Sequence, residues 1–405
     1  MANPQSVIHG TVSARAALVP AALAALVLQV LWELPLLAAT HGGIAFIGAW
    51  SFALVIVGLP LVLVELLMGR RSRRSPLEGL AVLTREADAR RGWRAAAWGG
   101  ALAVILVMAA TALIGGGTVS FLARVAGVHG AGSTTGPVLP LGSAGLLVLA
   151  GLVALLPAAR RQWVQGGSLA LILVLMIVAA IPGFGMAHDA YPARALSVND
   201  WREAFRLALL SLGSGLGLFW LTGMRLDKDV SLGRLAFGFL GLQVALGMLV
   251  LLAMAPFVMA RLANTGGADI IPTGPGVWVV LGTVLLIGLS GLVELAAPVL
   301  LRLTERGMAP APAAVLVFVG SGVLAEGVWL VGAQTGLMSV LTALYFVLLL
   351  VSAGLSVFAG WGMKVSHARK ELSLPSEGIY NVWRVAVRLA VPLLILWVVL
   401  RPLFG

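Results

Sequence analysis

The sequence predicts an all-α polytopic membrane protein, and three observations lead to this fold class. Of the 405 residues, 60% are hydrophobic and only 11% are charged, whereas about a quarter of a typical soluble protein is charged. The mean hydropathy of +1.03 is correspondingly high. Long apolar runs separated by short polar segments fill nearly the whole chain, so we expect one transmembrane domain over residues 1–405.

Eleven apolar runs are long enough to cross a bilayer as helices. A hydrocarbon core of about 30 Å requires roughly 20 apolar residues per helix, and charged or turn-forming residues bound each run. The expected spans are 14–39, 44–68, 95–123, 138–157, 166–185, 203–223, 235–260, 277–301, 312–332, 336–361 and 383–401.

The basic residues predict the orientation of these spans. Arg70, Arg71, Arg73 and Arg74 follow the second span directly, and all but six of the 27 Lys and Arg residues lie in the same alternate set of loops. Because basic loops stay on the cytoplasmic side, we expect the N-terminus in the cytoplasm and the C-terminus outside. Topology and contacts to anionic lipid then explain the net charge of +11, and no nucleic-acid partner is expected.

The chain lacks the residue patterns of common enzyme and cofactor sites. It contains no cysteine and five scattered histidines, which leaves no thiol nucleophile and no Cys- or His-based metal site. No phosphate-binding GxxxxGK[ST] loop occurs. We therefore expect no enzyme, no cofactor and no metal beyond a coupling sodium ion or protons.

The first two spans contain a distinctive motif. Residues 35–46 read PLLAATHGGIAF, and residues 58–70 read GLPLVLVELLMGR. This segment resembles the neurotransmitter:sodium symporter family of LeuT-type transporters, in which a proline precedes an NGGGAF-like turn and the pattern GxPxxxxExxxGR follows.

Two later segments agree with this resemblance. SLGSG at 211–215, followed by RLDKDV at 225–230, is similar to the family's broken sixth helix and the loop after it. Gly288, Ser290, Pro298 and Glu305 are similar to the eighth helix and its cytoplasmic end. The resemblance covers the chain in order and stops after an eleventh helix, as in some bacterial members. It implies a divergent bacterial member that crosses the cytoplasmic (inner) membrane several times.

The resemblance implies two inverted repeats of five helices, about residues 14–185 and 203–361, followed by an extra helix at 383–401. The first helix of each repeat is broken at mid-membrane in this fold, so that freed backbone groups can hold substrate and ions. Gly213, Gly215 and Gly217 predict this break in the sixth span, although small residues also allow close helix packing. The first span has no glycine between Gly10 and Gly42; Pro35 is expected to kink it rather than unwind it.

The sodium sites that the resemblance implies are incomplete. Sodium prefers several oxygen ligands, but the first-site positions read Val30, Leu209 and Gly241. We therefore expect this site to be lost. The residues left at the second site are Leu23, Leu26 and Ile287, through their carbonyls, and Ser290, through its hydroxyl. Gly291 replaces the other hydroxyl.

Four acidic residues fall inside apolar spans, namely Glu33, Glu65, Glu294 and Glu326. A buried unpaired carboxylate is costly, so acids within a membrane are functional candidates. Glu65 belongs to the family motif and is expected to form structural hydrogen bonds. Glu294 lies one helical turn after Ser290, and we expect it, with Glu33, to titrate during transport. The alternative for Glu294 is a neutral acid bonded to a backbone carbonyl.

The family has gates on both sides of the membrane. Its outer gate pairs an arginine, here replaced by Glu33, with an acid near Leu337, so that ion pair is not expected to form. Glu305 stands where the inner gate has an acid, and Asp227 is the charged candidate in the loop after the sixth span.

The resemblance also implies a central substrate site at mid-membrane. Its lining would be Ala25, Leu28, Gln29, Val107, Thr111, Ala208, Ser211, Gly213, Ser214, Gly215, Gly291 and Leu295. The family tyrosine that helps hold a substrate carboxylate is replaced by Thr111. Single hydroxyls in membrane helices usually serve packing, but their convergence from several helices favours a site.

Two functions remain open at this point. The first is secondary active transport, by alternating access, of an amino acid or related small organic solute, coupled to sodium at one residual site or to protons. The second is a non-transporting relative that acts as a membrane sensor or partner subunit. The oligomeric state does not follow from the sequence.

Overall fold

The computed structural model describes residues 14–27, 33–126, 138–263, 275–335, 337–372 and 374–404. Side chains are described in these ranges except at 14–16, 138, 261–263, 275, 332–335, 337–345 and 401–404. All regular elements in the described ranges are helices, as the apolar runs predict.

Helices occupy the first five expected spans. The first span contains α1 (Ala14–Ala25) and α2 (Glu33–Thr40), and the second contains α3 (Ile44–Ala53), the π-helix η3 (Leu54–Gly58) and α4 (Leu59–Ser72). The loop after them forms α5 (Pro76–Glu86) and the short 3-10 helix η4 (Arg91–Arg94). The third to fifth spans are α6 (Ala95–Val125), α7 (Val138–Ala154) and α8 (Ala158–Ala190).

Helices occupy the remaining spans as well. The sixth span is divided into α9 (Val198–Ser211) and α10 (Leu218–Arg225). The next three are α11 (Leu232–Ala263), α12 (Pro275–Glu305) and α13 (Pro310–Thr335), and the tenth is α14 (Leu337–Val357) with the π-helix η5 (Phe358–Gly362). After α15 (Val365–Leu372), the eleventh is formed by α16 (Glu377–Val385), the π-helix η6 (Ala386–Ala390) and α17 (Val391–Phe404).

Seven helices in the described part of the chain are long and apolar enough to cross a membrane, and an eighth is added if the bent pair Phe346–Gly362 and Val365–Leu372 forms one span. The sixth span is not among them because it consists of two shorter helices, and the first is not because its residues 28–32 lie outside the described ranges. The fourth is short and apolar, at Leu139–Ala154.

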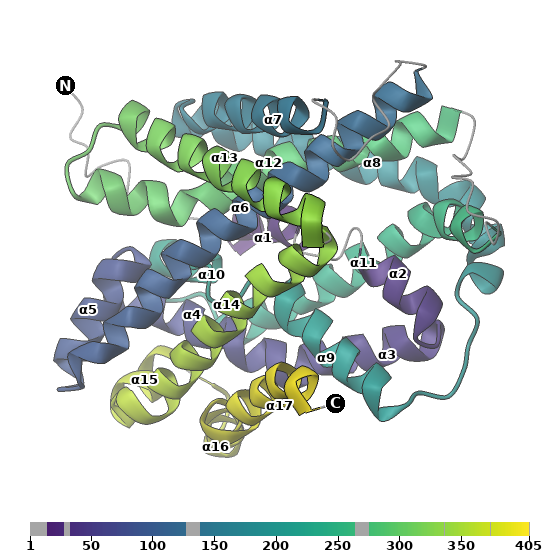
Figure 1. Cartoon of the computed structure of the whole chain (residues 1–405). Coiled ribbons are helices and arrows are strands. Elements are labelled where there is room, and N and C mark those ends of the chain that lie inside the picture. Colours follow the sequence, from purple (N-terminus) through teal and green to yellow (C-terminus); the bar gives the residue numbers. More distant parts are fainter. Residues whose placement is uncertain are drawn as a thin grey trace.

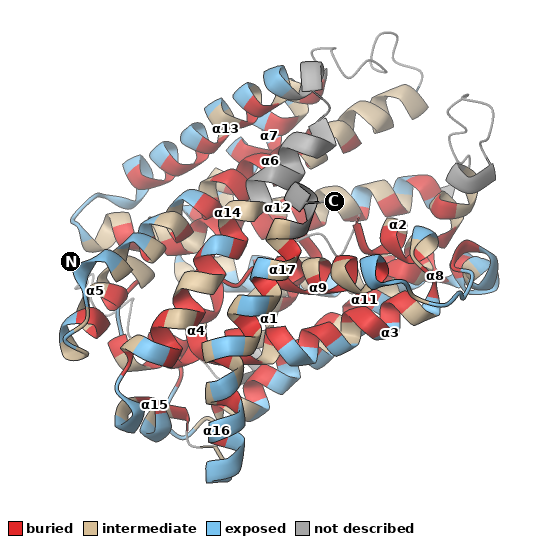
Figure 2. Cartoon of the chain, turned by 60° about the horizontal axis from the view of Figure 1, so that its bottom comes forward, coloured by how far each residue is buried: buried red, intermediate tan, exposed pale blue. Residues whose placement is uncertain are grey.

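The helices form a bundle in which α1 lies near the centre (Figure 1). It packs against α8, α10, α11 and α12, while α6 packs against α7, α12, α13 and α14. Figure 2 shows exposed residues on the outward face of α13 and buried residues toward the interior. Large exposed apolar side chains such as Leu141 on α7, Ile181 on α8 and Val323 on α13 give these helices a surface suited to lipid.

Pro35 lies in the first turn of α2. A proline is tolerated there because the first backbone N–H groups of a helix have no partner within the helix. The expected kink at Pro35 stays a prediction, because the residues that precede α2 are not described. Residues 28–32, between α1 and α2, lie outside the described ranges.

A close helix crossing joins α4 to α10. Gly69 lies against the carbonyl of Trp220, and Gly223 lies against the backbone of Leu66, so that a Cβ on either glycine would overlap the facing backbone. Two helices can approach this closely only where side chains are absent. This crossing brings the second span beside the break in the sixth.

Gly69→Ala is expected to lower the stability of the protein by about 1–3 kcal/mol, because the added methyl group forces α4 and α10 apart. Thermal unfolding of the purified protein in detergent measures the effect. Gly48→Ala is the matched control, since its Cβ would meet no atom within 4 Å. Equal melting temperatures for the two variants would show that the crossing is not a packing constraint.

Candidate functional site

The sixth span is broken, as its glycines predict. Helix α9 ends at Ser211, helix α10 begins at Leu218, and the segment between them is not helical. Gly213, Gly215 and Gly217 have φ values of 61°, 93° and 82°. These are left-handed conformations that L-residues with a side chain rarely adopt. The glycines therefore allow a sharp interruption that frees backbone groups within the membrane.

A buried carboxylate holds this interruption in place. Glu65 on α4 is fully buried, and one of its oxygens accepts hydrogen bonds from the Ser214 hydroxyl, at 3.0 Å, and from the Gly215 backbone N–H. From the other side, the Ser352 hydroxyl on α14 donates to the Ser214 carbonyl at 2.6 Å. The structural role expected for Glu65 thus takes a specific form: α4 and α14 replace the hydrogen bonds that the helix loses.

A second buried hydrogen bond joins the sixth span to the seventh. The side-chain amide of Gln243 on α11 donates to the Ser211 hydroxyl at 2.7 Å, and that hydroxyl donates to the Ala208 carbonyl. The predicted first-site positions Leu209 and Gly241 carry no side-chain oxygen, while Val30 lies outside the described ranges. Sequence reasoning missed Gln243, although it is the only polar side chain in the expected span 235–260.

An apolar contact occupies the region of the expected second sodium site. Leu23, Leu26, Ile287 and Ser290 are all buried, and the side chain of Val27 packs so closely on Gly291 that a Cβ there would overlap it. A serine or threonine at position 291 would displace Val27. The hydroxyl missing from Gly291 is thus replaced by hydrocarbon, which cannot coordinate sodium.

Glu33 has a partner that sequence reasoning did not find. At the start of α2, its carboxylate forms an ion pair with Arg206 on α9. Arg206 also pairs with Glu203 at 2.7 Å, and Glu203 pairs with Arg202. These four side chains form a charge-neutral network, so Glu33 is not the unpaired acid that was expected. The signal available was Arg206 itself, a basic residue inside the expected span 203–223.

A second link joins α2 and α9 at the opposite end of α2. Arg194 donates to the Thr40 carbonyl at 3.0 Å and to both carboxylate oxygens of Asp200 at 3.0 and 3.1 Å. Asp200 and Ser197 form a capping box at the start of α9. Burial alone would raise the pKa of Asp200, but the hydrogen bonds from Arg194 and Ser197 outweigh it and hold the pKa below its ordinary value.

The two expected inner-gate residues make local contacts. Glu305, at the end of α12, accepts hydrogen bonds from the Ser75 backbone N–H at 3.2 Å and from the Ser75 hydroxyl. It therefore holds the start of α5. Asp227 provides its backbone carbonyl to Arg70 at 3.1 Å. Their roles in gating stay predictions.

Glu294 lies on α12 between two arginines. Arg161, near the start of α8, and Arg225, the last residue of α10, both act electrostatically on its carboxyl group. All three side chains are partly accessible. Glu326, on α13, is half-buried. Sequence reasoning treated both arginines only as topology signals and missed their proximity to Glu294.

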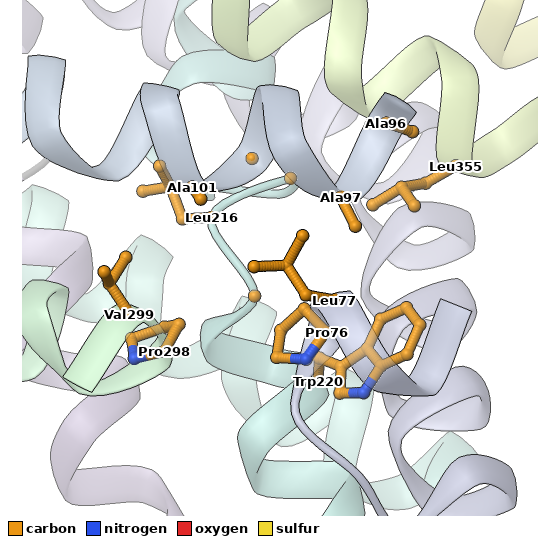
Figure 3. Close-up of a pocket in the computed structure, with 13 residues that line it drawn as sticks. Pro76, Leu77, Ala96, Ala97, Ala101, Leu216, Trp220, Pro298, Val299 and Leu355 are labelled. Atoms are coloured by element: carbon orange, nitrogen blue, oxygen red, sulfur yellow. The ribbon is translucent and has the colours of Figure 1, made fainter. Parts of the chain in front are cut away.

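The cavity beside the helix break differs from the expected central site. It encloses about 430 Å³, including the open space at its mouth. Gly215, Leu216 and Gly217 line it, and Figure 3 shows Ala97 and Ala101 of α6 on one side of the cavity and Pro76 and Trp220 on the other. All of its lining residues are apolar or glycine.

The other expected substrate residues do not line this cavity. The buried ones are Ala25, Val107, Thr111, Ala208, Ser211, Gly213, Ser214, Gly291 and Leu295, and the hydroxyl of Thr111 donates to the Val107 carbonyl of its own helix at 2.8 Å. Leu28 and Gln29 lie outside the described ranges. The central site therefore stays a prediction.

Comparison with known proteins agrees with the motifs. No family model matches the chain. An uncharacterized sodium-dependent transporter of Haemophilus influenzae is 28% identical over 93 residues, which are 22% of this chain and 20% of that protein. The uncharacterized sodium-dependent transporter YhdH of Bacillus subtilis is 30% identical over 106 residues, or 26% of this chain and 23% of YhdH. The matches thus span about a fifth of each relative.

The fold comparison covers almost the whole chain. The crystal structure of MhsT in complex with L-phenylalanine matches with a TM-score of 0.78 over 97% of this chain and 99% of MhsT, at 20% sequence identity. The chain is therefore a polytopic membrane protein, and its helix bundle with the broken sixth span has the LeuT-type fold. The partial sequence matches are to proteins named as sodium-dependent transporters, in agreement with the resemblance that the motifs carry. The similarity is to transporters, in agreement with the expectation of a non-enzymatic protein.

Glu65→Ala is expected to destabilise the protein, because it leaves the Ser214 hydroxyl and the Gly215 N–H without their buried acceptor, at about 1–3 kcal/mol for each unsatisfied group. Thermal unfolding in detergent would show the loss. Glu65→Gln keeps an acceptor oxygen of similar placement and should lose less. If Glu65→Ala unfolds at the wild-type temperature, the carboxylate does not hold the break.

Asp200→Asn should lower the melting temperature at neutral pH. The difference in melting temperature between wild type and variant should become smaller in acid. The lowered pKa of Asp200 means that its ionised form stabilises the folded state above the ordinary pKa of about 3.9, and this contribution disappears as the pH falls through the lowered value. Melting curves of wild type and variant across that range measure it. Asp229→Asn, at an exposed position, is the control, and a pH-independent difference for Asp200→Asn would contradict the prediction.

Proposed function

We propose that this protein is a secondary active transporter of an amino acid or a related small organic solute that works by alternating access. One observation carries the proposal. The sixth span is interrupted at three left-handed glycines, and Glu65 and Ser352 hold the interruption from two other helices. A helix broken within the membrane requires such compensation. In the LeuT-type fold, such breaks provide backbone groups for substrate and ions.

The overall arrangement supports the same proposal. The solved relative with this fold is bound to L-phenylalanine, and the curated relatives are named as transporters. We infer two five-helix inverted repeats at about 14–185 and 203–361, with the helix at 383–401 outside them. The distribution of basic loops supports a cytoplasmic N-terminus in a bacterial inner membrane. The solute is the proposed partner, with the lipid bilayer around the chain.

The coupling ion is proposed from the residues of this chain. The relatives are named as sodium-dependent, which makes sodium the first alternative. However, Leu209 and Gly241 provide no side-chain oxygens, and Val27 packs where the hydroxyl of residue 291 would lie. Glu294, by contrast, is an acid inside the membrane with two basic neighbours. These observations favour proton coupling at Glu294.

Uptake into proteoliposomes tests the proposal. L-phenylalanine is the first solute of an amino-acid panel, and the driving force is either a pH gradient or a sodium gradient. We expect uptake driven by the pH gradient to be lost in Glu294→Gln, because the amide cannot carry the proton. Glu326→Gln, which alters another acid within the membrane, is the matched control and should retain it.

Two results would contradict parts of this proposal. Unchanged pH-driven uptake by Glu294→Gln would exclude that residue as the proton carrier, and uptake that requires only sodium would exclude proton coupling. If no solute of the panel is taken up or raises the melting temperature of the protein, the non-transporting alternative, a sensor or partner subunit, is favoured. The loss of sodium ligands is the observation behind that alternative.

A further inference from the structure

Arg161, Arg225 and Glu294 belong to three different helices but lie at a similar depth in the bundle. The side-chain amide of Gln165 on α8 donates to the Ser290 carbonyl on α12 at 3.2 Å. Arg161 lies one turn before Gln165, and Glu294 lies one turn after Ser290. Because the fifth and eighth spans run in opposite directions, both steps lead toward the side expected to be cytoplasmic, and residues one turn apart share a helix face.

Helices that pack against one another surround this group of three side chains. Helices α8 and α10 both pack against α12, and α1 packs against all three. Arg161 and Arg225 act electrostatically on Glu294, and Arg161 also acts on Arg225. Among the described side chains, Glu294 makes no ion pair within 4.0 Å. The group therefore contains two positive charges and one negative charge that are close together but not in direct contact.

No other charged group in the described part of α1, α5, α6, α7 or α13 balances this excess. Helix α7 has no charged residue, and Glu78 of α5 pairs with Arg302, two turns beyond Glu294. The remaining charged residues on these five helices are Arg15, whose side chain is not described, Arg85 and Glu86 at the end of α5, of which Glu86 pairs with Arg71, Arg124 near the far end of α6, and Glu326 on α13. Among the residues that the structure describes, Arg161 and Arg225 are the charged groups that act on Glu294.

This arrangement suits an anion. One carboxylate offsets only one of two neighbouring guanidinium groups, and the remaining positive charge is strengthened where water is partly excluded. A guanidinium presents paired N–H donors that match the two oxygens of a carboxylate. All three side chains remain partly accessible, so a small anion can reach them. The expected central site, by contrast, lacks a cationic side chain.

We propose that Arg161 and Arg225 form a binding site for the carboxylate group of the transported solute, and that protonation of Glu294 controls its occupancy. This inference rests on the proposed transport of a solute that bears a carboxylate. Ionised Glu294 competes with the solute for the two guanidinium groups, whereas neutral Glu294 leaves both to the solute. Since linkage is reciprocal, a bound carboxylate favours the protonated form of Glu294. Proton and solute would then reach the cytoplasm together.

Acetate serves as the probe for this site, and acetamide is its uncharged counterpart of similar shape. The full-length protein in detergent is heated with either compound at about pH 6 and about pH 8, with chloride keeping the ionic strength equal, and affinity is derived from the rise in melting temperature. We expect acetate, but not acetamide, to stabilise the wild type, with an affinity at least about fivefold higher at the lower pH.

Variants assign this effect to the three residues. In Glu294→Gln, acetate is expected to bind equally well at both pH values, because the amide mimics the neutral acid. In Arg161→Gln and Arg225→Gln, stabilisation by acetate should be lost. Arg160→Gln is the matched control, since Arg160 is the exposed neighbour of Arg161. If Arg225→Gln does not fold, Arg225→Lys keeps the charge but not the paired donors and should bind acetate more weakly.

The proposal is overturned if acetate and acetamide act alike on the wild type, or if both arginine variants retain the wild-type response to acetate. Uptake measurements distinguish failure of the carboxylate site from failure of the proposed transport function. Normal pH-driven uptake by both arginine variants overturns the carboxylate site and leaves transport intact. Specific, pH-dependent acetate binding by a protein that transports no solute supports the site and overturns transport.

Discussion

The hydrogen bonds between Glu65 and the break in the sixth span are the interaction on which the rest of this structure depends. A helix interrupted inside a membrane leaves backbone groups that no water can satisfy. The carboxylate of Glu65 accepts from Ser214 and Gly215, while Ser352 donates to the opposite carbonyl. The second span can reach the break because Gly69 and Gly223 let α4 and α10 pack backbone to backbone. A carboxyl group deep in the bundle is thereby matched to a segment that needs acceptors.

The two sides of the bundle differ in their electrostatics. On one side, α2 and α9 are joined by the neutral network of Glu33, Arg206, Glu203 and Arg202, and again through Arg194. Those charges neutralise one another and hold α2 and α9 together. On the other side, Arg161, Arg225 and Glu294 lie near one another without direct ion pairs among the described side chains. A neutral network of direct ion pairs favours a fixed arrangement of its helices, whereas an unbalanced group of charges can respond to a proton or an anion.

The contact between α1 and α12 lies beside Glu294. Where the resemblance implies a hydroxyl ligand for sodium, Val27 packs on Gly291, and one turn further along α12 the chain carries Glu294. An oxygen ligand for a cation is thus missing at one position, and an ionisable oxygen is present at the next accessible turn. Our proposals of proton coupling and of a carboxylate site both start from this exchange of residue types.

The sequence by itself determined the fold class, the position of each helical span and the break in the sixth span. These follow from local properties, since an apolar run of sufficient length must form a helix in lipid and clustered glycines weaken it. The family motif added the LeuT-type arrangement and the structural role of Glu65. Only the tertiary structure decided that Gln243 meets Ser211, that Glu33 pairs with Arg206 and that Arg161 and Arg225 lie beside Glu294. Such pairs depend on which helix faces meet, and because apolar spans contact one another on several sides, their sequence pattern does not specify those faces.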